Sequence, residues 1–172
     1  MKKKTKKSKM SAKIVNYLKN AGVKHNVLEH KTVYTASDTA ATMRFGLNVI
    51  AKSLLIAAGK KYYIALLPAD YNLDFKKLIK AIGKINGQQI KSIKISSEKV
   101  MESLLKVKAG AMSAFGGAYK LQVIMDKKLT KIKKAIFSSG SFNHSIEMAV
   151  KDFIKLEKAV LAEFSVKKKI KK

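Results

Sequence analysis

The sequence predicts an α/β (α+β) fold, a single domain in which helices cover a mixed β-sheet. Segments with helical periodicity alternate along the chain with short apolar segments, so helices and strands are interspersed. Several of the expected strands are apolar on both faces, which is typical of strands covered on each side. The 172 residues, 47% of them hydrophobic, suit one domain with a substantial core.

Capping residues mark the first two helices. Ser11 precedes an amphipathic segment that stops at Gly22, so we expect a helix between them. Thr35 and Asp38 have the spacing of a capping box, and the helix that they begin should end at Gly46.

Two long apolar segments should form the centre of the sheet. Residues 49–58 and 62–68 are joined by a short stretch with a glycine, which indicates a hairpin or adjacent strands. Lys52 is the one ionisable residue of the first segment. Its ammonium group either extends to solvent at an exposed edge or lines a cleft and faces an anion such as a phosphate. Residue spacing leaves both possibilities open.

The remaining elements follow from the same apolar patterns and from the turn residues that flank them. In chain order they are a strand at 24–30, a helix at 73–83, a strand near 93–95, a helix at 96–107, a strand at 118–126, a short helix at 127–136, a strand at 144–150 and a helix at 151–164.

The chain is strongly basic. It has 37 lysine and arginine residues against 11 acidic ones, a net charge of +26. Eleven of the lysines lie in residues 1–10 and 165–172, which we interpret as solvated, mobile basic tails around a domain at 11–164; without them the charge falls from +26 to +15. A polyanion partner is expected, nucleic acid before an anionic membrane. An AT-rich genome would explain lysine in place of arginine, but not the scarcity of acidic residues.

Several classes of site and location are excluded by composition and spacing. The absence of cysteine rules out disulfides, thiolate zinc sites and cysteine nucleophiles. No Ser-His-Asp or paired-carboxylate pattern stands out, and the histidines lack metal-ligand spacing, so we expect neither metal nor cofactor. No signal-peptide core follows the basic start, and no apolar run approaches the roughly 20 residues that span a bilayer. We therefore expect a soluble, cytoplasmic protein.

The three histidines differ in their sequence context. His25 and His30 flank a short strand and suggest surface or structural roles. His144 follows a turn-like stretch and enters a strand, and such a junction is a usual position for a functional group.

Residues 110–117, GAMSAFGG, form the one glycine-rich stretch that suggests a binding loop. Glycines let the backbone approach a ligand, so its N–H groups could hold a phosphate or a carbonyl oxygen. It is neither a Walker A loop nor a dinucleotide fingerprint, because the residues that complete those motifs are missing. An ordinary turn between a helix and a strand is the alternative.

Taken together, these segments resemble the YbaK/prolyl-tRNA-synthetase-associated family of aminoacyl-tRNA editing domains. The resemblance runs from about His30 to Glu157, and its matching stretches follow the family's order: HKTVYTASDTAA, IAKSLLI followed by YYIALLPAD, LDFKKLIKAIG, GAMSAFG and LQVIMDKKL. It implies a free-standing trans-editing deacylase that serves translation fidelity. Such an enzyme hydrolyses the ester of a mischarged aminoacyl-tRNA, here with a small amino acid such as Ala, Cys or Ser on tRNA(Pro).

The resemblance also implies a site. Lys52 falls at the family's pocket lysine, which is needed for activity and engages the 3′-terminal nucleotide or the ester. Gly110 opens the family's substrate-binding loop, so Lys52 and Gly110 are the catalytic candidates. The substrate-binding candidates are Ala111, Met112, Ser113, Ala114, Phe115, His144 and His30. No metal, cofactor or covalent nucleophile is implied.

One residue departs from the family pattern. Ala114 stands where the family usually has proline, which should loosen the loop and reshape the pocket or reduce activity. If Met112 and Phe115 point inward, the pocket should favour small amino acids.

The implied partner is the acceptor end of tRNA, and the resemblance leaves an aminoacyl-tRNA synthetase open as a second. We expect a monomer or a weak dimer. Two alternatives remain. One is a module of the same fold that binds tRNA or a synthetase without hydrolysis. The other is a small nucleic-acid-compacting protein, which the large core disfavours.

Overall fold

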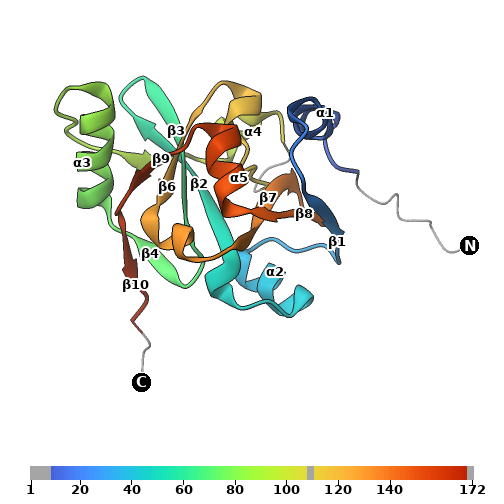
Figure 1. The fold of residues 1–172 in the computed structure, drawn as a ribbon. Coiled ribbons are helices and arrows are strands. Elements are labelled where there is room, and N and C mark those ends of the chain that lie inside the picture. Colours follow the sequence, from blue (N-terminus) through green and yellow to red (C-terminus); the bar gives the residue numbers. More distant parts are fainter. Residues whose placement is uncertain (1–8, 108–110, 170–172) are drawn as a thin grey trace, which may run out of the picture.

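The computed structural model describes residues 9–107 and 111–169, and within them a mixed β-sheet of eight strands forms the centre of the domain (Figure 1). Along the sheet the strands are β1 (Asn26–Glu29), β8 (His144–Ala149), β7 (Lys134–Ser141), β2 (Ile50–Ala58), β3 (Lys61–Pro68), β6 (Gln122–Asp126) and β9 (Val160–Ala162), with β5 (Lys94–Ile95) paired to β2. A separate two-stranded sheet pairs β4 (Tyr71–Leu73) with β10 (Ser165–Lys167).

Helices surround this sheet, so the predicted mixed sheet covered by helices is confirmed (Figure 1). The α-helices are α1 (Ala12–Ala21), α2 (Ala36–Met43), α3 (Phe75–Asn86), α4 (Glu98–Leu105) and α5 (Val150–Glu157), and the 3-10 helices are η1 (Leu47–Val49), η2 (Gly116–Tyr119) and η3 (Lys127–Lys131). Among the residues described, no helix combines the length and the apolar character needed to cross a membrane.

The expected central hairpin is present. Strands β2 and β3 pair in antiparallel fashion from Ala51↔Pro68 to Ala58↔Lys61. Gly59 makes the turn between them with a φ of 61°, a conformation that side chains disfavour. Strand β7 lies parallel to β2, and β6 lies parallel to β3, which makes the sheet mixed.

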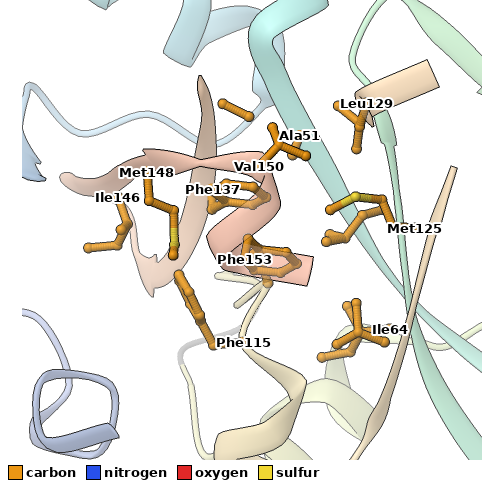
Figure 2. Packing of buried hydrophobic residues seen from close by; sticks show 14 of the residues in the cluster. Ala51, Ile64, Phe115, Met125, Leu129, Phe137, Ile146, Met148, Val150 and Phe153 are labelled. Carbon is orange, nitrogen blue, oxygen red and sulfur yellow. The ribbon is translucent and has the colours of Figure 1, made fainter. Parts of the chain in front are cut away.

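The main core is closed by three aromatic rings from distant parts of the chain. Phe137 of β7 stacks on Phe153 of α5, with ring centroids 4.1 Å apart. Phe115, just before η2, meets Phe153 edge-on at 5.5 Å (Figure 2). All three side chains are fully buried. The loop that begins at Ala111 is therefore anchored in the core within a few residues.

The predicted helix ends are confirmed in part. The Thr35 hydroxyl accepts a hydrogen bond from the Asp38 N–H at 3.0 Å, as the capping box requires. Helix α2 then ends at Met43, before the expected Gly46, because Arg44 adopts the left-handed conformation. Helix α3 continues past the predicted end to Asn86.

Three element predictions need correction. The helix expected at 127–136 is only the short η3, and β7 begins at Lys134. The helix expected at 151–164 ends at Glu157 and is followed by β9, because Lys158 turns left-handed with a φ of 48°. In the segment 118–126, which was expected to be one strand, η2 precedes a shorter β6.

The C-terminal boundary also differs from the expected one. Strand β10 begins at Ser165, where the sequence suggested the start of a tail, so ordered structure continues beyond residue 164. The chain is held there by the buried Asp126 carboxylate, which accepts a hydrogen bond from the Phe164 N–H at 2.8 Å.

Candidate functional site

The parallel strands β2 and β7 pair over a short distance and then separate. Strand β2 pairs with β7 only at Ile50↔Ile136 and Ala51↔Phe137. Further along, β2 pairs with β5 instead, at Ile56 and Ala57. In the part of the chain that the structure describes, residues 52–54 thus have a strand partner only on the β3 side. The opening leads to a cavity of about 280 Å³.

Beyond the separation, β7 is paired with the glycine-rich loop. Ser113 bridges to Ser139, and the Gly140 N–H donates to the Met112 carbonyl at 3.0 Å. The loop thus replaces β2 as the neighbour of β7 and forms one wall of the cavity. Five of the predicted site residues line that cavity: His30, Lys52, Ala111, Met112 and His144.

Lys52 lies in the cavity wall, so strand β2 places its ammonium group at the cavity. The side chain is half-buried, and its Nζ donates a hydrogen bond to the Tyr71 carbonyl at 3.3 Å. Burial lowers the pKa of Lys52 below its ordinary value, and the positive charge of Lys168 lowers it further. An anion in the cavity would oppose both effects, since it favours the charged ammonium group.

The two histidines at the cavity have defined hydrogen bonds. His30 Nδ1 lies 2.7 Å from the Lys31 carbonyl, which can only accept, so Nδ1 carries the proton in the neutral ring. His30 Nε2 then accepts the hydroxyl proton of Ser145 at 2.9 Å. His144 Nδ1 lies 3.0 Å from Ser141 Oγ. Both rings are therefore fixed in orientation beside the opening.

The family model for the aminoacyl-tRNA editing domain matches residues 30–156, which is most of the chain. The chain belongs to the aminoacyl-tRNA editing domain family. The family expected from the sequence motifs is thereby confirmed.

Solved structures share the fold of this editing domain. A hypothetical protein, APE2540, superposes with a TM-score of 0.77 at 19% identity, covering 90% of this chain and 99% of that one. A candidate trans-editing enzyme for prolyl tRNA synthetase superposes with a TM-score of 0.74, also at 19% identity, covering 94% and 100%. Similarity at this identity shows the fold alone. No curated protein sequence matches the chain.

The glycine-rich loop of the editing domain divides into a lining part and an anchoring part. Ala111 and Met112 line the cavity, whereas Gly110 lies outside the described residues. Ser113, Ala114 and Phe115, also expected at the substrate, are fully buried and lie outside the cavity wall. Their side chains fix the loop in the core, so of the two residues considered for an inward position Met112 lines the cavity and Phe115 does not.

Ala114, the departure from the family pattern, is held by a backbone hydrogen bond. Its N–H donates a hydrogen bond to the Ser138 carbonyl at 2.9 Å, and the residue is fully buried. Proline has no N–H and could not make this bond. The alanine therefore ties the loop of this editing domain to β7.

The structure adds lining residues that sequence patterns did not indicate. Tyr34 and Phe142 lie on the cavity wall from opposite halves of the chain. Ser53 also lines it, and its buried hydroxyl has no hydrogen-bond partner among the described residues. Because the segments that carry these residues meet only in the fold, no local motif could have indicated them.

The described residues around the cavity offer no metal site. Within residues 9–107 and 111–169, no three histidine or acidic side chains are placed so that they could hold a metal ion. The polar groups at the wall are instead one ammonium, two imidazoles and several hydroxyls. This set suits binding of an anion and of polar ester or ribose groups.

Replacing Lys168 with glutamine should raise the pKa of Lys52 toward that of a free lysine. Strand β10 places Lys168 next to the Tyr71 segment, through Lys167↔Tyr71 and the bond from the Lys168 N–H to the Asp70 carbonyl. Since its positive charge is one of the two causes of the lowered pKa, removing it leaves burial alone.

The measurement is ¹³C NMR titration of dimethylated lysines at low salt, where charge interactions between side chains are least screened. Lys169→Gln removes the same charge one residue further on and should have a smaller effect. A pKa of Lys52 that stays constant or falls in Lys168→Gln would contradict the prediction.

Proposed function

We propose that this editing domain is a free-standing trans-editing deacylase that hydrolyses the ester of a mischarged aminoacyl-tRNA. The observation that carries the proposal is the position of Lys52: a half-buried ammonium group in the wall of a cavity that the loop residues Ala111 and Met112 also line. Membership of the editing family supplies the substrate class. The domain's basic charge fits a nucleic-acid partner.

The reaction requires no group beyond those of the chain and the substrate. Lys52 binds the phosphate or ester end of the terminal nucleotide. The backbone N–H groups of Ala111 and Met112 stabilise the carbonyl oxygen as negative charge develops on it. Water attacks the carbonyl carbon, aided by a ribose hydroxyl of the substrate. The bond from the carbonyl carbon to the ribose oxygen breaks, and that oxygen leaves with a proton.

The size of the cavity supports a small amino acid. About 280 Å³ is at the low end for ligand pockets, and Met112 takes up part of the wall. We therefore propose Ala, Cys or Ser as the amino acid and tRNA(Pro) as its carrier, acting in the cytoplasm as a monomer or weak dimer. An aminoacyl-tRNA synthetase is a second proposed partner.

The test is the release of labelled amino acid from Ala-tRNA(Pro), Cys-tRNA(Pro) and Ser- or Thr-charged tRNAs. We expect the protein to hydrolyse at least one of these and to spare Pro-tRNA(Pro). If none is hydrolysed while tRNA still binds, the deacylase is wrong and a tRNA-binding module of the same fold replaces it.

A further inference from the structure

An exposed aromatic ring stands at the edge of the cavity. Tyr34 is 71% exposed, although it lines the cavity that contains Lys52. Its ring lies against that of Phe142, with centroids 4.9 Å apart and the planes inclined by 57°. The burial of Tyr34 thus contributes little to the stability of the fold, and its ring is open to a ligand that enters the cavity.

The backbone on both sides of Tyr34 is fixed. The Val33 N–H donates to the Phe142 carbonyl at 2.8 Å, and the His30 N–H donates to the Asn143 carbonyl at 3.0 Å. On the other side, Thr35 caps helix α2. The backbone that carries the exposed ring is therefore fixed before any ligand arrives, which lowers the entropy cost of binding to the ring.

We propose that Tyr34 is a stacking platform for the terminal base of the RNA whose ester enters the cavity. This inference rests on the proposed function. The base and the ester are attached to the same ribose, so an ester near Lys52 leaves the base close to the opening. Aromatic side chains bind bases of any sequence through their π faces.

The Phe142 ring packs against the ring of Tyr34. Because Phe142 is only partly exposed and packs against Tyr34, it limits the orientations of the tyrosine ring. Loss of such a stacking contact weakens binding by about 5- to 150-fold.

The experiment measures binding of a stem–loop RNA that carries alanine on its terminal ribose through an amide, which is not hydrolysed. A matched RNA lacks only the terminal base. Both RNAs are titrated against the wild-type protein, Tyr34→Ala and Tyr34→Phe. Phe75→Ala serves as control, because Phe75 is an exposed aromatic residue on α3 outside the cavity wall.

We expect removal of the base and the change Tyr34→Ala each to weaken binding by about 5- to 150-fold. Made together, they should weaken it no more than either alone, because each removes the same contact. Tyr34→Phe should retain most of the affinity, since it keeps the ring, and Phe75→Ala should bind both RNAs as the wild type does.

Three results would overturn the proposal. The first is equal binding of both RNAs by the wild type, and the second is unchanged binding by Tyr34→Ala. The third is an additive effect of the two changes, which would place Tyr34 against the ribose or the aminoacyl group instead. The RNA is not hydrolysed, so this binding test is independent of deacylation. If the effects of the base and of Tyr34 on binding are coupled but the protein hydrolyses no aminoacyl-tRNA, only the proposed deacylase activity is refuted. If the protein hydrolyses an aminoacyl-tRNA but the two effects are not coupled, only the stacking role of Tyr34 is refuted.

Discussion

Deacylation by Lys52→Met should be slower than deacylation by the wild type by about 100-fold or more, as expected when the group that positions the reacting ester is lost. Methionine has a similar length but carries no charge, so it keeps the packing in β2 and removes the ammonium group. The fold should tolerate the change. Lys52 makes one hydrogen bond, to the Tyr71 carbonyl, and its partial burial already disfavours the charge.

The measurement is single-turnover hydrolysis at saturating protein, which separates the chemical step from tRNA binding. Lys60→Met removes an exposed charge from the β2–β3 turn and should leave the rate unchanged. Lys52→Arg should recover only part of the activity, since the bulkier guanidinium fits the same wall less well. If Lys52→Met hydrolysed the substrate at the wild-type rate, Lys52 would have no role in the chemical step.

Ala114→Pro should lower the free energy of unfolding by about 2–4 kcal/mol, since it breaks one buried hydrogen bond and leaves its acceptor unpaired. The Ala114 N–H and the Ser138 carbonyl form that bond at 2.9 Å, and Ala114 has no exposed surface. The ring would also crowd the core next to Phe115. Because the loop lines the cavity two residues earlier, at Met112, activity should fall as well.

Urea unfolding followed by circular dichroism measures the effect. Ala114→Gly is the matched control: it keeps the N–H and loses only the methyl group, so it should destabilise the protein less than proline does. An Ala114→Pro protein as stable as the wild type would show that the backbone here accepts the residue usual in the family.

The parts of the fold that were predictable are those whose signals are local. The two central strands are long apolar runs with a glycine turn, and the Thr35 cap is contained within four residues. Strand β7 was missed altogether, because residues 134–136 were assigned to a helix and the stretch before His144 was interpreted as a turn. The segment is extended because β2 and β8 lie on either side of it. Neighbouring strands from elsewhere in the chain decided this segment.

The site was predictable to the same extent. Lys52 stood out as a charge in an apolar strand, but its place in a cavity depends on the separation of β2 from β7. Tyr34 and Phe142 are brought together by a backbone bond between Val33 and Phe142, which are more than 100 positions apart. No pattern within one segment reports such a contact.

The C-terminal strand has a practical consequence for anyone who prepares this protein. Strand β10 pairs with β4, and β4 supplies the Tyr71 carbonyl that holds Lys52. A chain cut at residue 164, or a purification tag fused close behind β10, would disturb that carbonyl without altering any residue of the cavity. An inactive preparation of this kind would be mistaken for an inactive protein, so affinity tags belong at the other end of the chain.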